Sequence, residues 1–154
     1  MIKQYDVIIS GCGPVGGIAA CFLAEQGLKV AVVEQNQHVY PYPRAINLDF
    51  FSVTFLKKLL GAQFQEIKFS PWEEAGYFLD KHRLDEPLGF LSVENKGDIG
   101  IGNFFYQPEL ESAIRKKVES RTNIDAFFNF SALKIYQAGE KAHLTIENLS
   151  LIHI

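Results

Sequence analysis

The sequence contains little of what several classes of protein depend on. It has two cysteines, Cys12 and Cys21, and four histidines in 154 residues, and neither set has the spacing of a metal or redox site. A disulfide framework and a cysteine-rich zinc site are therefore excluded. No apolar run approaches the roughly 18 residues of a membrane-spanning helix, and the first residues lack the layout of a signal peptide. These absences predict a cytoplasmic protein without a metal site.

An excess of charge of either sign is also missing. Fifteen Lys and Arg residues stand against 18 Asp and Glu residues, for a formal net charge of −3. Such a balance has no electrostatic footprint for nucleic acid or for an anionic membrane, so neither is expected as a partner. With 47% apolar and 21% charged residues, the composition is that of a globular chain of about one domain.

Residues 5–34 carry the pattern of a βαβ unit. A β-branched apolar run at 5–10 predicts a buried parallel strand, and a second such run at 29–33 ends at Glu34. Between them, apolar residues at helical spacing predict one buried stripe on a helix that Gly27 ends. The residues of this stripe are Val15, Ile18, Ala19, Phe22 and Leu23.

The loop between the first strand and the helix reads Gly11-x-Gly13-x-x-Gly16. In a dinucleotide-binding loop the first glycine makes a tight turn, the second lets the backbone approach a pyrophosphate, and the third lets helix and strand pack closely. The helix N-terminus then offers unpaired N–H groups to the phosphates. Glu34 stands where a carboxylate accepts hydrogen bonds from ribose hydroxyls, and it disfavours a 2′-phosphate. The pattern indicates dinucleotide binding; the alternative is a purely structural glycine turn.

Further blocks carry a family resemblance over about residues 5–147. They are Asp6-Val-Ile-Ile9, the glycine loop with Pro14-Val15, Val32-Val-Glu34, Tyr42-Pro-Arg-Ala45 and Phe105-Tyr-Gln-Pro-Glu-Leu-Glu111. With these blocks the chain resembles the FAD-dependent aromatic-ring hydroxylases, flavoprotein monooxygenases of the para-hydroxybenzoate hydroxylase type. It looks nearest the branch that acts on 3-(3-hydroxyphenyl)propionate. It departs from its relatives at Gly17, where they often carry a larger apolar residue, and at Asp49-Phe50-Phe51, where this branch usually has an acidic pair.

The resemblance implies FAD as cofactor, NADPH or NADH as electron donor, and a small phenolic substrate that reacts with O2. The glycines would cradle the FAD pyrophosphate, and Glu34 would hold the adenosine ribose. Arg44 and Gln107 would lie along the pyrophosphate and the ribityl chain; otherwise Arg44 is an ordinary surface arginine and Gln107 a helix cap. No catalytic residue is identified. The implied cofactor-binding residues are Gly11, Gly13, Pro14, Val15, Gly16, Glu34, Gln35, Arg44 and Gln107.

The expected fold class is α/β, a Rossmann-like FAD/NAD(P)-binding βαβ fold with the start of an inserted β-rich substrate domain. We expect residues 1–70 and 104–148 to belong to the FAD-binding domain, and residues 71–103, rich in aromatics and turn residues, to begin the substrate domain. Asn47 is the expected N-cap of a helix, and Pro108 suits the first position of another. A strand is expected at 124–130 and a hairpin at 132–136 and 141–147. The apolar stripe of the first of these helices is expected to be Leu48, Phe51, Phe55, Leu56 and Leu59.

Two later flavin motifs of the family, an Asp-Gly and a Gly-Asp segment, are due downstream of residue 148, and the sequence stops before the first of them. The chain is therefore expected to be a truncated part of a longer enzyme and to be inactive alone. Residues 149–154 match what a transposase adapter for DNA sequencing encodes in one frame, and are expected to be a non-native tail. The alternative is a natural strand end. Two competing functions stay open: another FAD oxidoreductase (epoxidase, halogenase or dehydrogenase), and a non-enzymatic dinucleotide-binding module.

Overall fold

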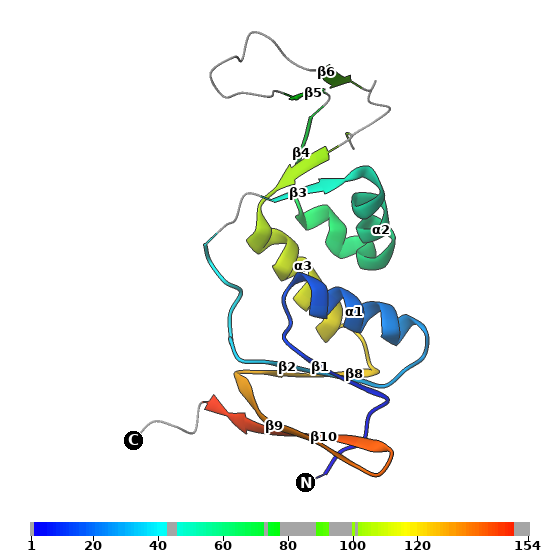
Figure 1. The fold of residues 1–154 in the computed structure, drawn as a ribbon, viewed down its shortest axis with the longest axis vertical. Coiled ribbons are helices and arrows are strands. Elements are labelled where there is room, and N and C mark those ends of the chain that lie inside the picture. The colour runs from blue at the N-terminus through cyan, green and yellow to red at the C-terminus, as the bar shows by residue number, and fades with distance from the viewer. Residues whose placement is uncertain are drawn as a thin grey trace.

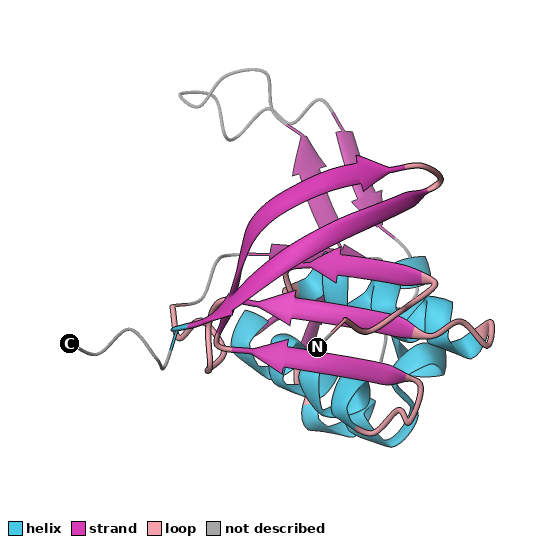
Figure 2. Cartoon of the chain, turned by 90° about the horizontal axis from the view of Figure 1, so that it is seen from below, coloured by secondary structure: helices cyan, strands magenta, loops and turns pink. Residues whose placement is uncertain are grey.

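The computed structural model describes residues 2–42, 46–72, 74–77, 89–92, 100 and 102–149. At its centre is a parallel sheet in the order β1-β2-β8 (Figure 2), in which Val7 pairs with Val30 and Val30 with Ile124. Helix α1 connects β1 to β2, and helix α3 precedes β8. The bounds are β1 (Val7–Ser10), α1 (Pro14–Glu25), β2 (Val30–Glu34), α3 (Gln107–Glu119) and β8 (Ile124–Phe128). The predicted βαβ unit and α/β class are confirmed.

The sheet is covered on both faces. In Figure 1, α1 and α3 lie on one face, and the antiparallel hairpin of β9 (Phe130–Ala138) and β10 (Lys141–Asn148) lies across the other. All five residues of β2 are buried as a result. Among the described residues β1 pairs with β2 alone, and Ile8 is 41% exposed at that edge.

A second, antiparallel sheet lies beyond the helices (Figure 1). Its order is β3-β7-β4, from β3 (Ile46–Asp49), β7 (Gly102–Phe105) and β4 (Phe69–Trp72). Trp72 pairs with Gly102, so the chain leaves and re-enters this sheet at neighbouring strands. Strands β5 (Glu74–Tyr77) and β6 (Gly89–Ser92) form a separate two-stranded pair. The short strands predicted between residues 70 and 103 are confirmed where the structure describes them.

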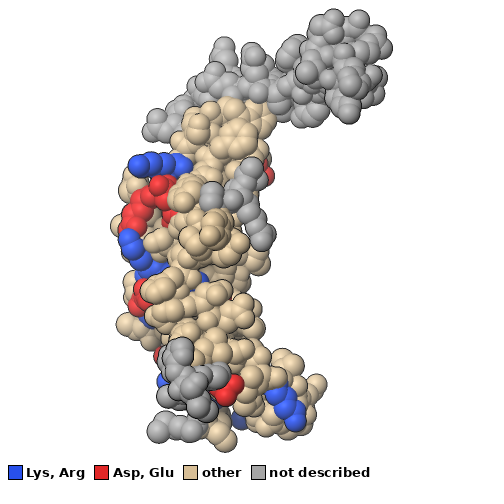
Figure 3. All heavy atoms as spheres, turned by 90° about the vertical axis from the view of Figure 1, so that its left-hand side faces the viewer, with Lys and Arg blue, Asp and Glu red and all other residues tan. Residues whose placement is uncertain are grey.

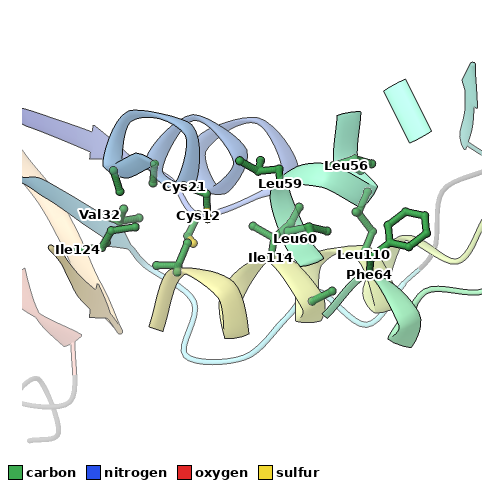
Figure 4. Packing of buried hydrophobic residues seen from close by; sticks show 14 of the residues in the cluster. Cys12, Cys21, Val32, Leu56, Leu59, Leu60, Phe64, Leu110, Ile114 and Ile124 are labelled. Carbon is green, nitrogen blue, oxygen red and sulfur yellow. The ribbon is translucent and has the colours of Figure 1, made fainter. Parts of the chain in front are cut away.

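The hydrophobic core lies between the sheet and the helices α1, α2 (Phe50–Leu60) and α3 (Figure 4). Cys12 and Cys21 are fully buried there as free thiols, close to Val32 and Ile114. Burial raises the pKa of each thiol to about 11, so at neutral pH both are protonated and unreactive. Both cysteines therefore serve packing, as predicted.

The predicted apolar stripe of α1 is wrong in part. Val15 is 83% exposed and Phe22 46% exposed. The buried face consists instead of Gly17, Ala20, Cys21 and Ala24. These small residues let the helix approach its neighbours closely, and bulkier apolar residues at Ile18 and Leu23 pack only at the edge of the core.

Helix α2 also differs from the prediction. Its N-cap is Asp49, not Asn47, because residues 46–49 pair with β7 as a strand. The carboxylate of Asp49 accepts a hydrogen bond of 2.6 Å from the backbone N–H of Ser52, which lowers the pKa of Asp49. The predicted apolar stripe of this helix is wrong in part, because Phe51 is 80% and Phe55 43% exposed. The buried residues are Val53, Leu56, Leu59 and Leu60.

The carboxyl-terminal predictions fare better. The hairpin is confirmed, with Lys141 paired to Ala138, and Pro108 lies in the first turn of α3. The strand expected at 124–130 is interrupted at Asn129, whose φ of 64° ends β8 and lets β9 begin in a new direction.

Within the described ranges, no helix has the length and apolar character to cross a membrane.

Candidate dinucleotide site

The glycine loop is tied to the end of β2. The backbone N–H of Gly11 donates a hydrogen bond of 2.7 Å to the carbonyl oxygen of Val33. Gly11 has a φ of 101°, in the left-handed region that other residues rarely adopt. The first glycine of the motif therefore makes the turn that carries the chain from β1 into α1.

The later glycines allow close packing. A Cβ atom built at Gly16 would collide with the carbonyl oxygen of Gly11 and crowd Ile9 of β1. At Gly17 a Cβ atom would collide with Cγ2 of Ile114 in α3. Gly16 thus keeps α1 against the strand, while Gly17 keeps α1 against α3. The contact with Ile114 is a physical reason for a glycine at position 17.

Gly13 differs from the other glycines of the motif. It is the N-cap of α1 in an extended conformation, φ −75° and ψ −171°, and a Cβ atom there would meet no atom within 4 Å in the described structure. Gly13 has no side chain to cap the helix, and its carbonyl oxygen accepts the first helical bond, from the N–H of Gly17 at 2.9 Å. The first turn of α1, which contains Pro14 and the exposed Val15, therefore borders open space. The positive end of the helix dipole lies at this turn.

Glu34, the last residue of β2, is 7% exposed and is hydrogen-bonded to the glycine loop. Its Oε2 atom accepts a hydrogen bond of 2.8 Å from the backbone N–H of Cys12. Its Oε1 atom accepts two from Asn36, from the backbone N–H at 2.8 Å and from Nδ2 at 3.0 Å. A carboxylate has about four acceptor positions, so one remains for a further donor.

A hollow of about 330 Å³ adjoins Glu34, open to solvent. It brings together three of the predicted site residues, Gly11, Glu34 and the exposed Gln35. The start of β9, which the sequence did not mark as part of a site, forms another wall. The remaining lining residues are Ser10, Val33, Asn36, Phe130, Ser131 and Ala132. Two larger hollows, about 380 and 450 Å³, lie between β1 and the hairpin and contain none of the predicted site residues.

Arg44 and Gln107 are the remaining predicted residues. Arg44 is outside the described residues. Gln107 is the first residue of α3 and not part of the hollow beside Glu34. Its Nε2 atom donates a hydrogen bond of 2.6 Å to Oε1 of Glu111, one turn further along α3.

Glu111 and Arg115 are buried polar residues that the sequence analysis did not single out; they are 6% and 9% exposed. Nη1 of Arg115 donates to the carbonyl oxygens of Asn36 and Gln37, both at 3.2 Å, and the guanidinium lies 4.9 Å from the ring centre of Phe128. Arg115 thus anchors the segment that follows Glu34. The i, i+4, i+8 spacing of Gln107, Glu111 and Arg115, beside the apolar stripe of α3, is the signal that could have found them.

Charges elsewhere are mixed. On the face in Figure 3, basic and acidic side chains lie beside one another. Lys116 pairs with Glu66, and Arg121 with Glu25. In the part of the chain that the structure describes, no group of three His, Cys, Asp or Glu side chains is arranged to hold a metal ion.

Comparisons with known proteins agree with this geometry. The chain is 27% identical over 128 residues to 3-(3-hydroxy-phenyl)propionate/3-hydroxycinnamic acid hydroxylase of Escherichia coli K12, covering 80% of this chain and 22% of that protein. The fold is similar to p-nitrophenol 4-monooxygenase PnpA from Pseudomonas putida DLL-E4 (TM-score 0.75, 20% identity, 97% of this chain and 38% of that one). It is also similar to the flavin-dependent monooxygenase PieE, solved with FAD and substrate (TM-score 0.73, 15% identity, 97% and 28%).

The chain thus spans about a fifth of the length of its curated hydroxylase relatives. The sequence model of the family described as FAD binding domain matches residues 4–143, which include both the glycine loop and α3. This match covers most of the chain. The protein belongs to the FAD binding domain family, and its sequence is distantly related to part of the 3-(3-hydroxyphenyl)propionate hydroxylases.

Proposed function

We propose that this chain binds FAD at the start of α1, as the cofactor-binding part of a cytoplasmic, NAD(P)H-dependent monooxygenase that hydroxylates a phenolic compound. The observation that carries the proposal is the environment of Gly13. A helix N-terminus without a side-chain cap faces open space at that residue, and the buried carboxylate of Glu34 lies behind the same loop. Open space, backbone donors and a ribose acceptor are what a dinucleotide requires.

Each predicted residue has a place in this proposal. The backbone at Gly11, Gly13 and Gly16 would surround the pyrophosphate, with Pro14 and the exposed Val15 covered by the cofactor. Glu34 would use its remaining acceptor position for a ribose hydroxyl, beside Gln35 at the hollow. Arg44 and Gln107 would contact the pyrophosphate and the ribityl chain.

The residues present fit such a cofactor. A Cβ atom at Gly13 would begin to fill the open space beside this residue. Oε1 of Gln107 is buried and has no hydrogen-bond partner among the described residues. Bound FAD would supply the redox and oxygen-transfer chemistry, and this chain would bind the cofactor, orient it and exclude water from it.

A Gly13→Val substitution tests the cofactor assignment. A branched side chain there would enter the pyrophosphate path, and we expect FAD and ADP affinity to fall more than tenfold by fluorescence quenching and calorimetry. Ala62→Val adds bulk at an exposed position outside the site and serves as the control. Because no atom of the described residues lies within 4 Å of the Cβ position of Gly13, the midpoint of thermal unfolding is expected to be unchanged. Wild-type affinity in Gly13→Val would contradict the assignment.

The substrate class rests on the relatives. The Escherichia coli hydroxylase and PnpA are both named after phenolic compounds. Since the chain spans a fifth of such relatives, the reaction belongs to a longer protein that would contain it. NAD(P)H oxidation by that protein with phenols, alkenes and sugars tests the substrate. Stimulation by non-aromatic compounds alone would favour another FAD oxidoreductase, and the absence of any oxidation would favour a dinucleotide-binding module.

We also propose that residues 71–103 begin a substrate domain inserted between FAD-binding segments 1–70 and 104–148. The pairing of Trp72 with Gly102 supports this, because an inserted segment must leave and return at one place. If this segment is a separate unit, limited proteolysis is expected to cut within 71–103 before it cuts within α1 or α3. Earlier cleavage within α1 or α3 would argue against a separate unit.

A further inference from the structure

The side-chain amide of Gln107 is satisfied on one side only. Nε2 donates 2.6 Å to Oε1 of Glu111, whereas Oε1 of Gln107 is buried and receives no hydrogen bond from any residue that the structure describes. A buried carbonyl oxygen without a donor is unfavourable, and native proteins tolerate it mainly where a ligand or water completes the bond.

Glu111 determines which way this amide faces. A carboxylate accepts hydrogen bonds but donates none, so only the NH2 group of Gln107 can face it. The distance of 2.6 Å is short for a bond from an N–H donor, in the direction expected for a charged acceptor. Glu111 is 6% exposed, so water competes little for the contact. The carbonyl oxygen of Gln107 is consequently directed away from Glu111.

The same stripe of α3 reaches the adenosine end of the proposed site. Arg115 lies eight residues after Gln107, about 12 Å along the helix axis at 1.5 Å per residue. Arg115 donates a hydrogen bond to the carbonyl oxygen of Asn36, and the backbone N–H of Asn36 donates one to Glu34. Gln107 and Arg115 are therefore too far apart along α3 for a single ribose to lie beside both, whereas an extended dinucleotide could.

We propose that Glu111 is a positioning residue that holds the Gln107 amide with its oxygen toward the cofactor, where it accepts a hydrogen bond from a hydroxyl of the flavin's ribityl chain. The inference rests on the proposed binding of FAD. An oxygen acceptor beside a carboxylate selects a hydroxyl and rejects a phosphate, because a phosphate oxygen has no proton to donate. Gln107 therefore contributes affinity for the polyol part of FAD and none for ADP.

The test compares FAD and ADP binding to the 154-residue chain and to four variants of it, one of which is a control. Glu111→Gln can donate as well as accept, so the Gln107 amide can turn over and lose its fixed direction. We expect FAD affinity to fall about 3- to 10-fold, measured by flavin fluorescence, with ADP affinity unchanged by calorimetry. Gln107→Leu is expected to show the same loss, and the double variant no further loss, because both act through one bond. Glu119→Gln removes a charge from the exposed end of α3 and is the control.

The possible outcomes distinguish a failure of this inference from a failure of the proposed FAD binding. Equal losses of FAD and ADP affinity in Glu111→Gln would mean a general structural role and overturn the proposal. Unchanged FAD affinity, or additive losses in the double variant, would also overturn it. If Glu111→Gln does not fold, Gln107→Leu, at a half-buried position, still tests the selective loss of FAD. A wild-type chain that binds neither ligand contradicts the proposed function itself, and this inference with it.

Discussion

The backbone N–H of Cys12 donates a hydrogen bond of 2.8 Å to Oε2 of Glu34, and so joins the middle of the glycine loop to the last residue of β2. Two segments with separate roles in the sequence pattern are one structural unit here. The carboxylate that would hold a ribose also fixes the backbone that would surround the pyrophosphate. Stability and ligand binding are therefore coupled at Glu34.

Replacing Glu34 with Gln is expected to lower the free energy of unfolding by about 1–3 kcal/mol, because the amide can accept on one side only. Its NH2 group then faces either the buried N–H of Cys12 or the part-buried donors of Asn36. Urea denaturation followed by circular dichroism measures the change. Glu119→Gln, the same substitution at an exposed position, should change stability by less than about 0.5 kcal/mol. Equal effects of the two substitutions would show that the hydrogen bonds of Glu34 contribute little.

Gly16 and Gly13 are expected to respond in opposite ways to alanine. Gly16→Ala forces a Cβ atom against the backbone of Gly11 and should cost about 1–3 kcal/mol of stability. Gly13→Ala meets no protein atom and should leave stability unchanged or slightly raised, while weakening FAD binding under the proposed function. Chemical denaturation and flavin fluorescence on both variants check the contrast. A stable Gly16→Ala variant would contradict the close contact of α1 with the loop.

The local parts of this fold could be predicted from the sequence. The strand, glycine loop, helix and second strand of residues 5–34 follow from short-range periodicity and turn chemistry, and the hairpin around Gly139 follows from the same signals. Strand β3 could not be predicted in this way. It exists because Ile46 pairs with Phe105, far along the chain, and that pairing also moved the N-cap of α2 to Asp49.

Burial on the helices was harder to predict than the helices themselves. α1 has apolar residues on more than one face, and the bulky ones, such as Val15 and Phe22, do not mark its buried side. The small residues do, because α3 packs closely against them. Charged side chains such as Glu111 and Arg115 in α3 are mostly exposed in folded proteins. Here both are buried and have hydrogen-bond partners on other residues.

The contact of Gly17 with Ile114 should be visible in a double-mutant cycle. Gly17→Ala should cost about 1–3 kcal/mol and Ile114→Ala about 2–5 kcal/mol, by overpacking and by cavity formation. Because the second change removes the atom that the first collides with, the double variant should be more stable than the sum predicts by at least about 0.5 kcal/mol. The pairing of Gly17→Ala with Leu56→Ala in α2 is the control and should be additive. Additive behaviour in both pairs would contradict the contact.

The Tyr5–Asp125 hydrogen bond should make stability depend on pH at both extremes. The hydroxyl of Tyr5 donates 2.6 Å to Oδ2 of Asp125, which Lys3 also contacts at 3.1 Å. These donors hold the pKa of Asp125 below its ordinary value of 3.8. Burial, together with the bond to Asp125, holds the pKa of Tyr5 well above 10.0.

The signs of the two shifts define the window. The lowered pKa of Asp125 stabilises the fold above pH 3.8, and this contribution is lost as the pH falls through the folded-state pKa. The raised pKa of Tyr5 stabilises the fold below pH 10.0, and this contribution is lost as the pH rises toward the folded-state pKa. Tyr5→Phe should therefore lower the free energy of unfolding by about 0.5–1 kcal/mol near pH 7, a small effect because Asp125 is partly exposed. The difference from wild type should shrink below pH 3.8 and above pH 10. Urea denaturation across this range measures it, with Tyr42→Phe, at a 70% exposed ring, as the control. A difference that is constant with pH would show that the hydrogen bond does not link the two ionisations.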